Sequence, residues 1–276
     1  MNKTKIEWVK NPDGTQGYTW NPITGCLNGC EYCYARKLAN GRLRARYLAN
    51  HNVMPDYDAL NSAYEDIADP FYPRFWESRM YDLRGDGNYD NAYPNRNAYH
   101  TSREKIKGIF VCDMSDLFGI GIPEEWTRRV LEQIRIFSQH RFYLLTKQPQ
   151  NLVKFSPFPD NCWVGVTATT YKQFQDALEG LCQIVAKVKY ISFEPLLESI
   201  EIWHSSKTTD NDFTIGGGID WVIIGSQTKP YKPPKIEWVE EITRACDGVG
   251  IPMFHKDNLK PIFPIPTNTL RQEMPK

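Results

Sequence analysis

The feature that most constrains the fold is an alternation, from Lys105 onward, of short apolar runs and amphipathic helical patterns. The runs are rich in β-branched and aromatic residues, which predicts strands buried on both faces. The six predicted strands are 106–111, 142–146, 163–166, 190–193, 221–225 and 252–255. Strands separated by helices pair in parallel through right-handed crossovers, so we predict an open or closed α/β barrel.

The connecting segments carry apolar residues at helical spacing, which predicts crossover helices within 123–140, within 174–185 and from residue 236. Pro123 and the acidic pair Glu124 and Glu125 are typical of a helix start. A chain of 276 residues, 41% hydrophobic, suffices for one such barrel. Because no repeat or flexible linker indicates a second unit, we predict a single domain over residues 1–276.

The N-terminal third is less regular. Two β-prone runs, 6–9 and 17–20, flank the turn sequence 11–14 and predict a hairpin. Residues 34–50 read as a basic helix without an acidic residue, which is either a solvated face or a phosphate-contacting surface. The aromatic-rich insertion 51–105 is interpreted as a substrate cap or as a structural wrap.

Three of the seven cysteines, Cys26, Cys30 and Cys33, fall within eight residues with the spacing C-x3-C-x2-C. Gly25 and Gly29 supply the positive φ angles that a tight loop around one inorganic centre needs. A structural zinc site takes four protein ligands, whereas a four-iron cluster on three thiolates leaves one iron open. The alternatives are a chance cluster, or zinc with a distant fourth ligand.

This spacing, with Tyr32 before the last cysteine, resembles the signature of the radical S-adenosylmethionine (SAM) enzymes. The resemblance implies a [4Fe-4S] cluster on the three cysteines, with SAM bound at the open iron. A one-electron donor such as ferredoxin or flavodoxin would reduce the cluster, and SAM would be cleaved to a 5′-deoxyadenosyl radical that takes a substrate hydrogen.

Polar residues follow the predicted strands, where parallel barrels place their chemistry. Lys147, Glu194 and Lys256 are charged and come directly after apolar runs, so a cavity there would desolvate them. We predict these three as catalytic residues in contact with SAM or substrate. Ser115, Asp116 and Thr167 also suit helix caps or turns.

Several segments together resemble the phage gene product 37/68 family, which is similar to radical SAM proteins and has no known function. They are I-E-W from Ile6, T-W-N-P from Thr19, D-M-S-D-L-F from Asp113, L-T-K from Leu145, G-V-T from Gly165, S-F-E-P-L-L from Ser192 and D-W-V-I-I-G from Asp220. The resemblance implies a partial TIM-type (β/α)6–7 barrel with SAM across the strand ends. The implied cofactor-binding residues are Tyr32, Asp113, Ser115, Asp116, Thr167 and Gly225.

The chain departs from the family pattern at two sites. Residues 113–116 lack the glycine-rich turn that the wider superfamily places against the SAM amino group, and 225–228 read G-S-Q-T where relatives show G-G-E-S. The contact with the SAM amino group must therefore differ in this chain, and a role that relatives give to the glutamate of G-G-E-S cannot be carried over.

Composition limits the cellular compartment, the partners and the alternative classes of protein that remain. An odd cysteine count and no apolar stretch of signal or membrane length predict a cytoplasmic protein without membrane contact. Zero formal net charge counts against nucleic acid as partner, although the basic helix keeps nucleic acid or a nucleotide among the candidate substrates. The main rival is a non-catalytic iron–sulfur or zinc protein that binds a partner through the insertion. A barrel hydrolase is disfavoured because the five histidines lack ligand-like spacing.

Overall fold

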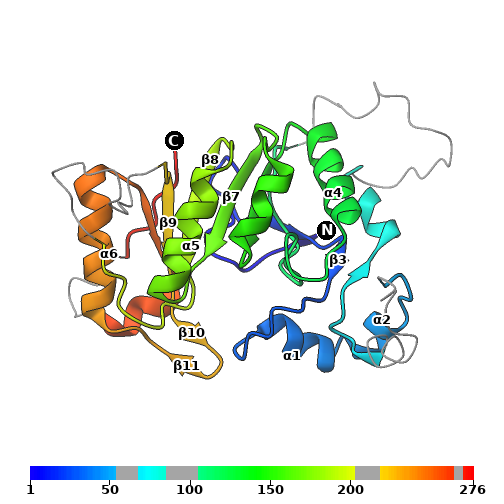
Figure 1. Ribbon diagram of the computed structural model, residues 1–276, viewed down its shortest axis with the longest axis horizontal. Coiled ribbons are helices and arrows are strands. Elements are labelled where there is room, and N and C mark those ends of the chain that lie inside the picture. The colour runs from blue at the N-terminus through cyan, green and yellow to red at the C-terminus, as the bar shows by residue number, and fades with distance from the viewer. Residues whose placement is uncertain (54–67, 85–104, 203–217, 264–269) are drawn as a thin grey trace.

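A mostly parallel sheet forms the centre of the protein, which a computed structural model describes over residues 1–53, 68–84, 105–202, 218–263 and 270–276 (Figure 1). The sheet has eight strands in the order β1-β2-β5-β6-β7-β8-β9-β12. Their bounds are β1 Asn2–Lys3, β2 Tyr18–Trp20, β5 Gly108–Val111, β6 Arg141–Thr146, β7 Cys162–Thr167, β8 Val188–Phe193, β9 Trp221–Ile224 and β12 Met253–His255. Only β1 is antiparallel to its neighbour. The predicted α/β class is confirmed.

The six predicted strands after Lys105 and the strand before the cysteine loop are confirmed, with ends shifted by one or two residues. The predicted hairpin is wrong in its first strand. Residues 6–9 form a turn, with the Val9 N–H donating to the Ile6 carbonyl at 3.1 Å, and β2 pairs with β1 instead. The turn lets Trp8, 1% exposed, insert among the strands, and burial of that ring outweighs a regular pairing.

Three helices, α4 Glu124–Ile136, α5 Tyr171–Cys182 and α6 Ile236–Val249, cover one face of the sheet (Figure 1) and confirm the predicted crossovers. The predicted helix 34–50 is divided into α1 Tyr34–Asn40 and α2 Arg44–Leu48. Gly41 ends α1, its N–H donating to the carbonyls of Lys37 and Leu38. The other elements are β3 Ile23–Thr24, β4 Arg74–Phe75, β10 Gln227–Thr228, β11 Tyr231–Lys232 and the 3-10 helices η1 Glu77–Arg84, η3 Pro149–Phe155 and η4 Asp257–Ile262.

The sheet is curled around Trp8. Its indole lies 5.1 Å from the ring of Phe110 on β5 and 6.0 Å from that of Trp221 on β9, between ring centroids. Those two rings are therefore at most about 11 Å apart, whereas four steps of about 4.8 Å separate such strands in a flat sheet. The face opposite the helices is thus concave and filled by aromatic side chains.

Alternation along each strand sorts the side chains between the two faces. On β8, Ile191 and Phe193 pack under the helices, while Tyr190 belongs to the concave aromatic cluster. Continuing the second row by steps of two leads to Ser192 and then Glu194. On every parallel strand, the alternate side chains that face the concave side form a row that continues past the carboxyl end of the strand.

Of the insertion 51–105, residues 54–67 and 85–104 lie outside the described part, so the prediction of a cap cannot be followed there. The described stretch 68–84 packs beside the cysteine loop, with β4 antiparallel to β3. Among the described residues, no helix combines the length and the hydropathy needed to cross a membrane.

Candidate functional site

A cavity of about 310 Å³ lies at the carboxyl ends of the parallel strands. Almost every residue predicted from sequence borders it, namely Cys26, Cys30, Tyr32, Cys33, Asp113, Ser115, Asp116, Lys147, Thr167, Glu194 and Lys256. Parallel strands bring their carboxyl ends to one edge, and alternation aims every second side chain inward. Lys147, Thr167, Glu194 and Lys256 each continue an inward row by this rule.

The cysteine loop is held against the end of β5. Gly25 and Gly29 have φ of 88° and 69°, as predicted, and a Cβ on Gly25 would lie 2.4 Å from the Tyr72 carbonyl oxygen. The Gly25 N–H donates to the Met114 carbonyl at 2.9 Å, and Ser115 Oγ donates back to the Gly25 carbonyl at 2.5 Å. Ser115 therefore positions the loop.

The three thiols border one cavity and remain unpaired by disulfides. Burial, followed by the charge of Asp116, raises the pKa of Cys26 to about 12, and burial likewise raises that of Cys30. Ionised Cys30 and Cys33 make smaller contributions to the same rise. A cation bound by the thiols would favour their thiolate forms, and soft thiolates are suitable ligands for iron.

Among the described residues, no group of three or more His, Cys, Asp or Glu side chains is placed so that it could hold a metal ion. A fourth cysteine, Cys112, borders the cavity, although the sequence indicated only a packing role. It is 2% exposed, and burial raises its pKa. Cys112 directly follows β5 and lies outside the cysteine loop.

Asp116 connects the loop to β6. One carboxylate oxygen accepts from Asn28 Nδ2 at 2.9 Å and from the Lys147 N–H at 2.8 Å. The Lys147 ammonium lies 5.8 Å from the centre of the Tyr32 ring. Burial lowers the pKa of Lys147, whereas the negative charges of Cys30 and Asp116 act to raise it. Lys147 has no carboxylate partner within 4 Å among the described residues, so its ammonium can take a ligand anion.

Asp113 supplies a second carboxylate, partly buried, to the same cavity. It accepts from Asn21 Nδ2 at 2.5 Å and from the Tyr34 hydroxyl at 3.3 Å, and that hydroxyl also donates to the Asp113 carbonyl at 2.6 Å. Burial raises the pKa of Asp113, against these hydrogen bonds. Tyr34 was missed in the sequence, because its position beside Asp113 depends on the path of the loop.

Lys256 lies between two carboxylates across the cavity from the cysteines. It forms ion pairs with Glu194 and, at 3.5 Å, with Glu7. Burial disfavours the ammonium, but the two glutamates outweigh burial and raise the pKa of Lys256. Gly225 is not among the lining residues, and its cofactor contact stays a prediction; a Cβ there would lie 2.8 Å from Lys256 Cδ and 3.4 Å from Glu194 Cγ. Glycine leaves room for this ion pair.

Replacing Lys256 by Met is expected to lower the free energy of unfolding by about 2–4 kcal/mol, because two half-buried carboxylates lose their common cation. The matched control is Lys260→Met on η4, whose ion pair with Asp257 is more than half exposed and contributes at most about 1 kcal/mol. Urea denaturation of both variants provides the measurement. Equal losses in the two variants would contradict the assigned importance of the Lys256 ion pairs.

Two buried polar atoms on the cavity wall lack a hydrogen-bond partner in the described part of the chain, Trp8 Nε1 and Ser192 Oγ. Their residues are 1% and 0% exposed. An unpaired buried donor or hydroxyl costs about 1–3 kcal/mol, which a polar ligand in the cavity would recover. The inward row Tyr190, Ser192 and Glu194 could have identified Ser192 in the sequence, whereas nothing local identifies Trp8.

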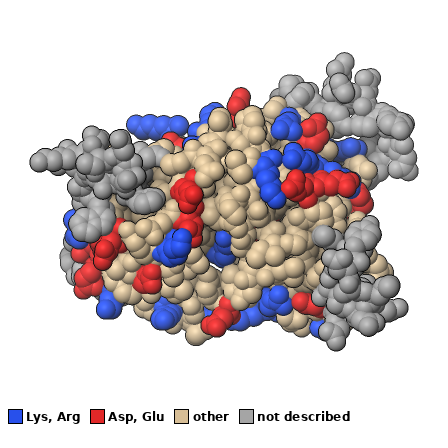
Figure 2. Space-filling model, viewed as in Figure 1, with Lys and Arg blue, Asp and Glu red and all other residues tan. Residues whose placement is uncertain are grey.

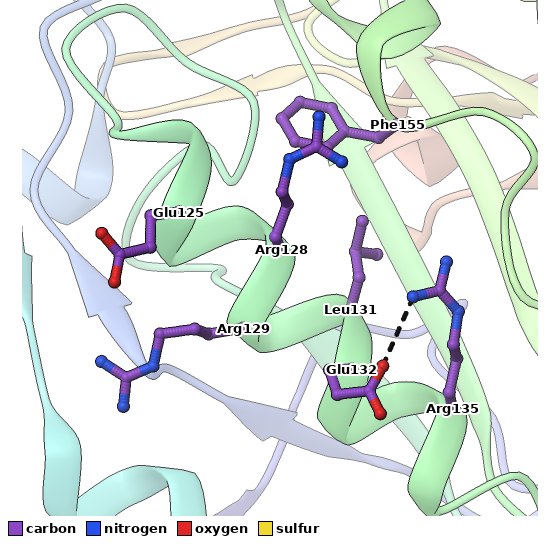
Figure 3. A pocket seen from close by; sticks show the side chains of 7 residues that line it. All are labelled: Glu125, Arg128, Arg129, Leu131, Glu132, Arg135 and Phe155. Atoms are coloured by element: carbon purple, nitrogen blue, oxygen red, sulfur yellow. Dashed lines mark hydrogen bonds and ion pairs between the residues drawn. The ribbon is translucent and has the colours of Figure 1, made fainter.

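A larger hollow, about 570 Å³, lies on the outer face of α4 (Figure 3). It is lined mainly by charged side chains that pair with one another or stack on the protein: Arg135 contacts Glu132 at 3.5 Å, and Arg128 lies over the Phe155 ring. No thiol or buried polar group borders it. The cavity at the strand ends is therefore the candidate site.

Fold and cavity together define an α/β protein with a three-cysteine loop at the carboxyl edge of a parallel sheet. The chain belongs to a family described as protein of unknown function, DUF5131, whose model matches residues 3–260. No curated protein and no solved structure gave a significant match to the chain.

Proposed function

We propose that this protein is a radical SAM enzyme built on a partial TIM-type barrel. The observation that carries the proposal is that Cys26, Cys30 and Cys33 all border one ligand-sized cavity, which is also lined by unpaired buried polar atoms. The strand order and the curled sheet support such a barrel. The resemblance to the phage gene product 37/68 family stays a prediction.

The three cysteines would hold a [4Fe-4S] cluster, which when reduced supplies the electron for cleavage of SAM. The donor set suits this group better than zinc, because the loop offers three soft ligands, whereas a structural zinc site takes four protein ligands. Ferredoxin or flavodoxin is the class of electron donor we expect.

Charges in the cavity favour a cationic ligand. Asp113, Asp116 and Glu194 border it, against Lys147 and Lys256, and the latter is already shared by Glu194 and Glu7. SAM carries a sulfonium, an ammonium and a carboxylate. We assign Asp113 or Asp116 to the cationic part and Lys147 to the carboxylate, while Trp8, 1% exposed, closes the cavity floor to water.

Anaerobic reconstitution tests the proposal. The full chain is expected to bind about four irons, as a cubane cluster requires, and to release 5′-deoxyadenosine and methionine from SAM in the presence of dithionite. A reconstituted protein that holds zinc or iron but leaves SAM intact under reduction would favour the non-catalytic rival instead.

The Lys147→Met variant is expected to raise the KM for SAM by about tenfold to a hundredfold, because a charge-assisted hydrogen bond to a carboxylate contributes about 1.5–3 kcal/mol. Iron content should not change. The control is Lys147→Arg, which keeps the cation and is expected to recover part of the affinity. SAM cleavage measured over a range of SAM concentrations separates KM from kcat, and an unchanged KM in Lys147→Met would refute the assignment.

A further inference from the structure

We propose that the substrate of this cavity is single-stranded nucleic acid, bound at the rim of the cavity by a mouth surface made of Tyr34, Lys37, Lys229, Tyr231, Lys232 and Lys235. The chemistry rests on the proposed function, but binding at this surface needs neither SAM nor an electron. The two can therefore fail separately.

The mouth surface joins two elements that frame the opening. Tyr34, the first residue of α1, borders the cavity itself, as do Gln227 and Thr228 of β10. Thr228 pairs with Tyr231 of β11, and Lys37 Nζ donates to the Lys229 carbonyl at 3.0 Å. Helix α1 and the β10–β11 hairpin thus lie at the same end of the molecule (Figure 1) and are directly linked.

These two elements are basic in a chain whose formal net charge is zero. Residues 31–48 hold five arginines and lysines against Glu31, and residues 227–238 hold three lysines against Glu237. Basic side chains gather along the lower edge of the face in Figure 2, near α1 and the hairpin, with a few acidic ones beside them.

The lysines of the mouth surface are exposed, and none has a carboxylate within 4 Å in the part of the chain that the structure describes. The α4 face differs, because Arg128, Arg129 and Arg135 each pair there with a glutamate. Unpaired lysines around an opening suit a ligand that carries repeated negative charge.

Aromatic rings accompany these charges. Tyr34 and Tyr231 are 44% and 46% exposed. Both hydroxyls are anchored, that of Tyr34 on the Asp113 carbonyl at 2.6 Å and that of Tyr231 on the Asn258 carbonyl at 3.1 Å. Because the rings are held in place, stacking a flat group on them costs little side-chain entropy. Stacked bases and neighbouring phosphates are the combination that single strands offer.

The acidic interior of the cavity would keep the phosphates of a single strand apart from its bases. Asp113, Asp116 and Glu194 border the cavity and would repel phosphates. The phosphate backbone would therefore stay at the rim, while an unpaired base faces the opening. A duplex, whose bases are stacked and paired, does not offer free base faces.

Fluorescence anisotropy with labelled single strands of about 12 nucleotides tests the proposal on the full chain, with and without reconstituted iron. The variant Lys229→Glu/Lys232→Glu/Lys235→Glu is expected to bind about 10- to 100-fold more weakly, with a shallower dependence on salt between about 50 and 200 mM. The control is Lys3→Glu/Lys105→Glu/Lys187→Glu, the same charge change on exposed lysines at the amino edge of the sheet. It should stay within about twofold of the wild type because no phosphate contact is lost.

The tyrosine is tested separately. Tyr231→Ala is expected to weaken binding by about fivefold or more, Tyr231→Phe should keep it, and an abasic strand of equal length should not distinguish Tyr231→Ala from wild type. Equal losses in the two triple variants, no binding by the wild type at low salt, or equal binding of poly-glutamate would overturn the proposal. If SAM cleavage fails while strands still bind at this surface, only the proposed chemistry is lost.

Discussion

Replacing Cys26, Cys30 and Cys33 together by Ser is expected to reduce the iron bound after reconstitution from about four atoms per chain to nearly none. Formation of 5′-deoxyadenosine should become undetectable, because the hydroxyls are hard, weakly acidic ligands that do not replace thiolates. Iron and acid-labile sulfide are quantified on the purified monodisperse protein, together with the visible absorption of the cluster.

The matched control is Cys112→Ala, which also removes one sulfur that borders the cavity. Cys112 is buried after the end of β5 and lies outside the cysteine loop, so we expect the iron content to stay near that of the wild type. If Cys112→Ala loses the metal as completely as the triple variant, four protein ligands close the site. The open coordination position, and with it the radical SAM proposal, would then be wrong.

The variant Arg74→Ala is expected to lower the free energy of unfolding by about 3–5 kcal/mol. The Arg74 side chain is 0% exposed and donates to the carbonyls of Asn50, Asp69 and Tyr72 at 3.1, 2.8 and 2.8 Å. Burial lowers the pKa of Arg74. Removing the guanidinium takes a donor from three partly buried carbonyls and leaves a cavity.

Arg74→Ala should also reduce iron loading, because the backbone that it holds supports the cysteine loop. The Cys26 N–H donates to the Phe71 carbonyl at 3.0 Å, and the Tyr72 carbonyl abuts Gly25. Urea denaturation and iron analysis are compared with those of Arg135→Ala, a solvent-exposed arginine on α4 (Figure 3) expected to cost at most about 0.5 kcal/mol. A loss below about 1 kcal/mol in Arg74→Ala would contradict the role given to its hydrogen bonds.

The strands and much of the site could be predicted because they depend on local pattern and on one topological rule. Apolar runs separated by amphipathic helices lead to a parallel sheet, and parallel strands bring Lys147, Glu194 and Lys256 to one edge. Gly25 and Gly29 were predictable because only glycine takes positive φ cheaply. The cluster, SAM and the substrate remain proposals.

Other features were not predictable because they depend on contacts between distant segments. The run 6–9 has strand propensity, yet it turns so that Trp8 can fill the interior of the curled sheet. Glu7 forms an ion pair with Lys256, near the other end of the chain. Tyr34 donates to the carbonyl of Asp113, which lies 79 residues further along. The close approach of Gly225 to Lys256 and Glu194, where a side chain would crowd their ion pair, also depends on such contacts.

The sequence by itself determined the class of fold, the edge of the sheet that carries the polar residues, and the three-cysteine loop. Periodicity and spacing suffice for these, since they follow from backbone geometry and ligand chemistry. Only the tertiary structure decided which charges pair, which buried polar atoms lack partners, and that α1 meets the β10–β11 hairpin at the opening. Those outcomes depend on burial and on the desolvation that burial imposes, and neither is encoded in neighbouring residues.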